Sequence, residues 1–271
     1  SDSLPVRKAI LLKMKGVIPM RVLFVGDVYM DRGREAFERF YPAAKNLCKP
    51  NFVIVNGENI ANGNGLTEEI YREYMRMGVN VFTLGNHAYS RKDAENVLAL
   101  DYVVRPANYG PGASGKGYVT CRVNDRTITV VNLLGRVFMH DQIDSPFAAI
   151  DKILEETGSD YYIIDFHAEA TSEKYAMANY LDGRVSALLG THTHVTTADE
   201  TVFPKGMLYI TDVGMTGVRY SIIGGDILQG IRKFVTGIPE RVRPEKNGPL
   251  QFNAVLLDLE QKRIERVNFT E

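Results

Sequence analysis

The chain has 271 residues, of which 45% are hydrophobic and 24% charged, and its 32 basic residues nearly balance its 33 acidic ones. A net charge of −1 argues against a general nucleic-acid-binding surface, because such a surface needs clustered lysines and arginines that contact many phosphates. No apolar run approaches the ~20 residues that span a bilayer, so we expect a soluble protein with no membrane partner.

Residues 1–19 differ in character from the rest of the chain. Basic residues surround short apolar runs there, but a long apolar core and a small-residue cleavage site are missing, so we expect no secretory signal. We interpret residues 1–19 as an expression leader or N-terminal extension before Met20. Residues 20–271 are then expected to form a single domain, which their number allows.

Strand and helix patterns alternate through the first half of the chain, which predicts βαβ units and a largely parallel sheet. The second of the helices has Thr67 at its start and Gly78 after its end, as capping preferences favour. We expect strands over residues 21–26, 52–56 and 80–84, and helices over residues 33–47 and about 67–77.

The pattern changes at residues 117–133, which read as a β-hairpin that turns at Asn124-Asp125. A second sheet or an antiparallel edge is therefore expected to begin there. After it we expect a helix from Ser145 to about Thr157, a strand over 161–166, a helix over about 172–181 and a strand over 185–189, followed by β structure over 207–211, 251–258 and 262–268.

Polar side chains follow five of the expected strands, and four of the five histidines of the chain are among them. If these strands lie parallel in one sheet, their polar tips emerge along one edge, where the ligands of open α/β sheets bind. The residues concerned are Asp27, Glu58, Asn59, Asn86, His87, His167, His192 and His194.

These residue types point to a metal site. Carboxylate, amide and imidazole donors without a thiolate suit Mn, Fe or Zn in a hydrolytic site. Seven or eight donors exceed what one ion needs, which favours two ions bridged by a carboxylate. Each histidine alone could be a surface or structural residue, and it is their shared position after apolar runs that carries the prediction.

The motifs GD (26–27), GEN (57–59), GNH (85–87), His167 and GTHTH (190–194) resemble the calcineurin-like metallophosphoesterases. The bacterial YmdB-like branch is more similar still, because Tyr29 stands where most of the superfamily has a histidine, and Glu58-Asn59 where most have an aspartate. The segments 165–174, 203–217 and 221–226 resemble that branch too, so the resemblance runs from Met20 nearly to the C-terminus.

The resemblance implies a layered α/β/β/α sandwich with two mixed sheets and two metal ions per chain, of Mn or Fe, with Zn also open. A hydroxide shared by the metals would be the nucleophile, and His87 the general acid. By matching motif positions, one metal would be held by Asp27, Glu58, Asn59 and His194, and the other by Asn86, His167 and His192, with Glu58 bridging them.

The function implied is a phosphodiesterase that hydrolyses 2′,3′-cyclic nucleotides. Two alternatives stay open: a phosphomonoesterase that acts on nucleotides or phosphoproteins, and a regulatory protein that binds metal or a nucleotide without turnover. The presence of His87 favours an enzyme, because binding alone needs no general acid.

Four further residues are candidates for binding the substrate. Arg32 and Arg34 follow Asp27 closely enough to reach a phosphate, although solvated arginines at a helix start explain them equally well. Asn62 belongs to a loop whose amide groups could face an anion, or to a plain turn. Ser172 lies at an expected helix start, where it could hold phosphate or cap the helix. We also expect the space between Tyr29 and residues 62–65 to receive a ribose.

Only two cysteines are present, Cys48 and Cys121, which favours a reducing cytoplasm and no disulfide framework. A small-molecule phosphoester is the partner that the resemblance implies. A homo-oligomer is left open by the sequence.

Overall fold

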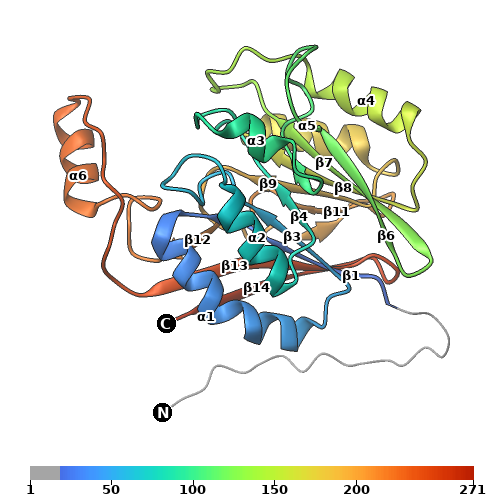
Figure 1. Cartoon of the computed structure of the whole chain (residues 1–271), viewed down its shortest axis with the longest axis horizontal. Coiled ribbons are helices and arrows are strands. Elements are labelled where there is room, and N and C mark those ends of the chain that lie inside the picture. Colours follow the sequence, from blue (N-terminus) through green and yellow to red (C-terminus); the bar gives the residue numbers. More distant parts are fainter. Residues whose placement is uncertain (1–18) are drawn as a thin grey trace.

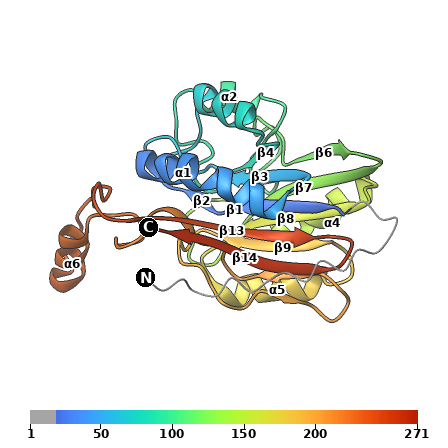
Figure 2. The same ribbon diagram turned by 90° about the horizontal axis from the view of Figure 1, so that it is seen from below.

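The computed structural model describes residues 19–271, so nearly all of the leader expected over residues 1–19 lies outside the described residues. Two β-sheets pack face to face, and helices cover their outer faces (Figures 1 and 2). This is the layered α/β/β/α sandwich that the sequence led us to expect.

The first sheet has eight strands in the order β2-β12-β13-β1-β3-β4-β5, with β14 paired to β13. The neighbours β1, β3, β4 and β5 run parallel, whereas β13 runs antiparallel to β1, so the sheet is mixed. Its strands are β1 (Arg21–Val25), β2 (Asp27–Val28), β3 (Phe52–Asn56), β4 (Val81–Thr83), β5 (Val103–Val104), β12 (Met215–Val218), β13 (Leu250–Asp258) and β14 (Arg263–Thr270).

The second sheet has six strands in the order β10-β11-β9-β8-β7-β6. Its four central strands are parallel and its two edge strands antiparallel. Its strands are β6 (Tyr118–Val123), β7 (Arg126–Leu134), β8 (Tyr161–His167), β9 (Ala187–Thr191), β10 (Thr201–Val202) and β11 (Leu208–Ile210).

The five strands that carry the polar tips do not all lie in one sheet, so that condition is not met. The hairpin β6–β7 does start a second sheet, but β7 also pairs in parallel with β8 over seven residue positions, and β8 with β9. As a result, the strands that precede His167 and His192 belong to the second sheet, while those that precede Asp27, Glu58 and Asn86 belong to the first.

Three apolar layers hold the sandwich together. The layer between the sheets contains Phe24 and Ile54 from one sheet and Ile163 and Leu189 from the other. Figure 2 shows α1 and α2 on one side of the sheets and α5 on the opposite side. The helices on the first sheet are α1 (Met30–Cys48), α2 (Glu68–Met77) and α3 (Ala94–Leu98), and those on the second are α4 (Pro146–Glu156) and α5 (Thr171–Leu181).

Local signals place most element ends close to their expected positions. Thr67 Oγ1 accepts a hydrogen bond from Ile70 N at 3.3 Å, and Gly78 ends α2 with φ at 96°. The first helix begins three residues before the expected start at residue 33. Strand β9 runs two residues later than the expected range 185–189, which brings His192 directly after its end.

An arm that contains α6 (Ile227–Thr236) projects from the sandwich (Figure 1) and was not expected from the sequence. None of the helices within residues 19–271 is long and apolar enough to cross a bilayer. The arm nevertheless exposes six large apolar side chains, those of Ile227, Leu228, Ile231, Phe234, Val235 and Ile238.

Candidate metal centre

All eight residues expected at the strand tips come together where the two sheets end side by side. Asp27, Glu58 and Asn86 follow strands of the first sheet, whereas His167 ends β8 and His192 follows β9 of the second. Every one of the eight lies within hydrogen-bonding distance of at least one other. The cluster is therefore built from both sheets.

One group of donors surrounds the ring of His167. Its Nε2 lies 3.1 Å from Asn86 Oδ1, 3.1 Å from His192 Nδ1 and 3.3 Å from Glu58 Oε1. Ligand atoms of Glu58, His167 and His192 all lie within 4.8 Å of one another. Such a set of convergent nitrogen and oxygen donors can hold one cation.

A second group is formed by Asn59 and His194. Asn59 Oδ1 lies 3.1 Å from His194 Nε2, and His194 Nδ1 donates to the carbonyl oxygen of Ile223 at 2.9 Å. Because a carbonyl can only accept, the proton of a neutral His194 sits on Nδ1, which leaves Nε2 as a lone-pair donor toward Asn59 and the cluster.

Asp27 is fully buried next to His192. Its Oδ2 accepts from His192 N at 3.3 Å, but its Oδ1 has no hydrogen-bond partner within residues 19–271. Burial raises the pKa of this carboxyl group. A buried carboxylate oxygen without a partner is costly, and a cation beside it would remove that cost. The donor set thus fits a metal centre.

A glycine makes the close packing around Glu58 and His167 possible. A Cβ atom on Gly85 would lie 2.5 Å from His167 Nε2 and closer still to Glu58 Oε2. Any larger residue would therefore occupy the space into which these two ligand atoms point. The glycine of the GNH motif has this steric role.

The orientation of His167 is fixed from behind by a buried polar network. His167 Nδ1 lies 2.8 Å from Thr191 Oγ1, which in turn donates to Asp165 Oδ1 at 2.7 Å, and Asn56 Nδ2 donates to Asp165 Oδ2 at 2.9 Å. Since Thr191 gives its proton to Asp165, it accepts from His167 Nδ1, and Nε2 is left as the ligand atom.

Ionisation states in the metal-free protein follow from burial and from these neighbours. Burial alone would raise the pKa of Glu58, but the imidazoles of His167 and His87 hold it well below 4.5. Burial alone would lower the pKa of His167, but Glu58 and Asp27 raise it to about 9. Burial, together with the charge of His167, lowers the pKa of His192 to about 3. Glu58 is thus anionic and His192 neutral, as ligands must be.

A buried ion pair holds the turn that carries His192 and His194, and sequence reasoning missed it. Lys174 Nζ lies 2.9 Å from Asp212 Oδ2 and donates to the carbonyl oxygen of Thr191 at 3.0 Å, while Asp212 Oδ2 accepts from Thr193 N at 3.0 Å. His192 has φ of 104° and His194 of 66°, which side chains rarely adopt. The pair anchors the backbone on both sides of His192 in this conformation.

His87 lies at the edge of the cluster. Its Nδ1 is 3.0 Å from Glu58 Oε1 and 3.2 Å from Asn59 Nδ2, and its backbone N donates to Glu58 Oε2 at 3.1 Å. Burial lowers the pKa of His87, but the hydrogen bond and charge of Glu58 outweigh it and raise the pKa above 6.5. With 33% of its side chain exposed, the ring can exchange a proton with a bound molecule.

The candidates Arg32 and Arg34 have their hydrogen-bond and ion-pair partners outside the cluster. Arg32 pairs with Glu35 and donates to the carbonyl oxygen of Gly248 at 3.1 Å. Arg34 pairs with Asp31 at 2.7 Å, so both arginines have carboxylates of their own helix as partners.

The remaining candidates occupy loops and a helix start. Ser172 is exposed in the first turn of α5, and Ala170, not Ser172, is the N-cap residue. Asn62 has φ of 52° and lines a cavity beside the cluster. Tyr29 places its ring edge-on to that of His194, with centroids 5.4 Å apart.

Comparison with known proteins gives consistent matches over most of the chain. A family model described as YmdB-like protein matches residues 23–270. The 2′,3′-cyclic-nucleotide 2′-phosphodiesterase of Bacillus subtilis is 42% identical over 92% of this chain and 96% of its own.

Two solved structures share the fold closely. A hypothetical protein from Thermus thermophilus has a TM-score of 0.87 at 46% identity and covers 93% of this chain and 100% of its own. A phosphatase from Mycoplasma pneumoniae has a TM-score of 0.87 at 35% identity and covers 94% of each chain.

Proposed function

The chain belongs to the YmdB-like family and is a phosphoric ester hydrolase, and we propose that it is a two-metal phosphodiesterase that opens nucleoside 2′,3′-cyclic phosphates. The observation that carries this proposal is a cluster of seven residues with oxygen or nitrogen ligand atoms, among them the buried carboxylates of Glu58 and Asp27, with His87 at its edge.

The family resemblance implies a division of the ligands between two ions, and the contacts support it for Asn86, His167 and His192 and for the pair Asn59 and His194. Asp27 is assigned to the second ion on the resemblance alone, because its hydrogen bond is with His192 N. Asn86, His167 and His192 would hold one ion, since they meet around His167 Nε2. Asp27, Asn59 and His194 would hold the other, and Glu58 would bridge both. When bound, the two ions would lower the pKa of a water molecule and neutralise charge on the phosphate. Mn or Fe suits this donor set best, and Zn remains a candidate.

His87 would act as the general acid. The Nδ1–H of a protonated His87 donates to Glu58 Oε1, so that Nε2 is the ring atom able to give a proton to the leaving oxygen. The raised pKa keeps more of the imidazole protonated at neutral pH. A ribose hydroxyl is a poor leaving group as an alkoxide, so this proton transfer matters most for a nucleotide ester.

The relative from Bacillus subtilis is named for 2′,3′-cyclic nucleotides, and the chemistry of the site suits that substrate class. A cyclic phosphodiester carries one negative charge and a strained ring whose leaving oxygen His87 can protonate. The test compares kcat/KM of the Mn²⁺-loaded enzyme for adenosine 2′,3′-cyclic phosphate, adenosine 3′,5′-cyclic phosphate and adenosine 3′-monophosphate. We expect the 2′,3′-cyclic ester to be the best substrate. If the monoester is best, the protein is a phosphomonoesterase instead.

A homo-oligomer is also part of the proposal. An isolated ten-residue helix is marginal in water, and the exposed apolar side chains of α6 are large enough to form an interface with a second copy. Light scattering of the wild-type protein and of Phe234→Asp tests this, since only the wild type should then exceed the mass of one chain.

The cytoplasmic location expected from the two cysteines stays a prediction.

A further inference from the structure

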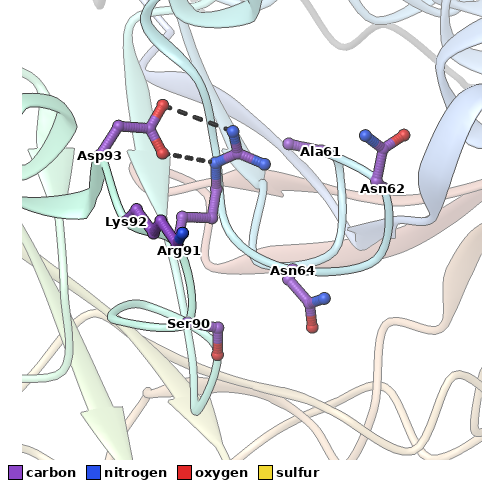
Figure 3. Close-up of a pocket in the computed structure, with 7 residues that line it drawn as sticks. All are labelled: Ala61, Asn62, Asn64, Ser90, Arg91, Lys92 and Asp93. Atoms are coloured by element: carbon purple, nitrogen blue, oxygen red, sulfur yellow. Dashed lines mark hydrogen bonds and ion pairs between the residues drawn. The ribbon is translucent and has the colours of Figure 1, made fainter.

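A cavity of about 390 Å³ lies beside the metal centre, between two loops that run on from its residues. One loop begins two residues after Asn59, and the other begins where Ser90 N donates to the carbonyl oxygen of His87 at 3.1 Å. Figure 3 shows the two loops facing each other across the cavity. The lining residues are Ala61, Asn62, Asn64, Ser90, Arg91, Lys92 and Asp93.

The two walls are fixed relative to His87. A Cβ atom on Gly65 would lie 3.2 Å from the carbonyl oxygen of His87 and 3.3 Å from Arg91 Cδ, so the loop backbone packs on both. Asn59 Nδ2 donates to the carbonyl oxygen of Gly63 at 3.1 Å and lies 3.2 Å from His87 Nδ1. The cavity thus lies between two loops that are packed against the backbone of His87 and against Asn59.

The side chains that line the cavity favour an anion as its ligand. Arg91 donates to both oxygens of Asp93, at 2.9 and 3.4 Å, through Nε and Nη2, which leaves Nη1 without a hydrogen-bond partner in the described chain. Lys92 has no carboxylate within ion-pair distance among residues 19–271. Two cations and one carboxylate give the lining a net charge of +1, and the amides of Asn62 and Asn64 add donors.

The position of the cavity identifies which part of a substrate would reach it. His87 protonates the leaving oxygen, so the alcohol half of the ester lies on the His87 side. In a nucleoside 2′,3′-cyclic phosphate that half is the ribose, whose 5′ carbon carries either a hydroxyl group or a second phosphate. Such a phosphate presents oxygens that suit a guanidinium group, an ammonium group and amide donors.

We propose that this cavity binds a second phosphate group attached to the 5′ oxygen of the ribose, so that the preferred substrate is a 2′,3′-cyclic phosphate that is also 5′-phosphorylated. The inference rests on the proposed function. Two kinds of molecule carry this chemistry: the 3′ end of an RNA chain, where the phosphate links to the preceding nucleotide, and a nucleoside 5′-phosphate 2′,3′-cyclic phosphate. The near-neutral charge of the whole chain agrees with anion binding that is local to this cavity.

The test measures kcat/KM of the Mn²⁺-loaded enzyme for adenosine 2′,3′-cyclic phosphate, its 5′-phosphorylated form, and the dinucleotide ApA with a terminal 2′,3′-cyclic phosphate. We expect one or both phosphorylated substrates to be favoured by roughly 10- to 100-fold, the size of one or two charge-assisted hydrogen bonds. Whichever is turned over faster identifies the source of the second phosphate. The double variant Arg91→Gln/Lys92→Gln should bring the ratio of kcat/KM values close to one, mainly through KM.

The matched control is Lys262→Gln/Arg263→Gln, which removes the same two charges from another place on the chain. Arg263 forms an ion pair with Glu265, two residues further along, just as Arg91 does with Asp93. This variant should keep the wild-type ratio. Calorimetric binding of adenosine 3′,5′-bisphosphate and of adenosine 3′-monophosphate gives a second readout, in which the bisphosphate should bind more tightly only while Arg91 and Lys92 are present.

Two results would overturn the inference: a wild-type ratio near one, or a wild-type ratio retained by the Arg91/Lys92 variant. Its failure is distinct from failure of the proposed function. If adenosine 2′,3′-cyclic phosphate is hydrolysed without any preference for the 5′-phosphorylated forms, only the second-phosphate site is wrong. If no cyclic phosphate is hydrolysed, the proposed function falls and this inference falls with it.

Discussion

Gly85→Ala tests whether the metal centre depends on the close approach of the GNH backbone to its ligands. The added methyl group would lie 2.5 Å from His167 Nε2, where ordinary contacts begin at 3.4 Å, so the ring or the loop must move by about 0.9 Å. Metal–ligand distances tolerate only about ±0.2 Å. A shift of this size therefore removes His167 from its productive ligand position, and Glu58 with it, because Glu58 Oε2 would lie closer still to the methyl group.

We expect Gly85→Ala to weaken Mn²⁺ binding by at least 10- to 100-fold, the loss seen when ligands are misoriented. Overpacking should also lower the free energy of unfolding of the metal-free protein by about 1–3 kcal/mol. Titration calorimetry gives the affinity and stoichiometry, and urea denaturation gives the stability. Gly110→Ala is the matched control, because a Cβ atom there has no atom within 4 Å. Wild-type Mn²⁺ affinity in Gly85→Ala would refute the steric argument.

Three further predictions concern the ion pair, the general acid and the pH dependence. Lys174→Met should lower the free energy of unfolding by about 3–5 kcal/mol because it leaves Asp212 charged and buried, and Lys174→Met/Asp212→Asn should cost less. Urea denaturation of the single and the double variant measures the two free energies of unfolding. Equal losses of stability would mean that the unpaired charge of Asp212 is not the cause. His87→Ala should keep the metals but lower kcat roughly 10²–10⁴-fold, with a smaller loss for nitrophenyl esters, whose leaving groups need no proton. Equal losses for both ester types would assign His87 a positioning role. The pKa of His167 in the folded protein, about 9, lies above the ordinary value of 6.5. Protonated His167 therefore stabilises the metal-free fold, fully below pH 6.5, and this stabilisation is lost as the pH rises through 9. The thermal midpoint of the metal-free protein should fall accordingly between pH 7 and 9, and a midpoint that stays level would contradict the ion pairing of His167 with Glu58.

The strand tips could be found from the sequence because each is a polar residue within a few positions of the end of a short apolar run. Asp27, Glu58 and Asn86 lie just beyond β1, β3 and β4, and this pattern does not depend on which sheet a strand joins. The sheet assignment did depend on pairing between distant strands. Nothing in the local pattern of residues 126–134 says that β7 pairs with β8 as well as with β6. The hairpin pattern therefore left a second sheet and an antiparallel edge open, and only the family resemblance favoured two sheets.

The residues that hold the proposed ligands in place could not be predicted from the sequence in the same way. Asp165 lies inside an apolar strand and Lys174 inside a helix, where sequence alone does not tell a buried polar partner from an exposed side chain. Asp212 sits after β11 like a strand-tip ligand, yet it binds a lysine and backbone amides. One signal for such a residue was available in the sequence: an acidic residue within an otherwise apolar strand. This signal marks Asp165 as a buried polar partner.

The two-sheet arrangement bears on how the centre would hold the two proposed ions. Ligands at the edge of a single sheet would approach a metal from one direction, whereas here Glu58 and Asn59 approach from the first sheet and His167, His192 and His194 from the second. Glu58 contacts His167 from the opposite sheet at 3.3 Å, and Asn59 contacts His194 at 3.1 Å. Each proposed ion would therefore be held by both sheets. Metal binding should then oppose separation of the sheets and stabilise the fold as a whole, because a site formed by two layers is lost when either layer unfolds.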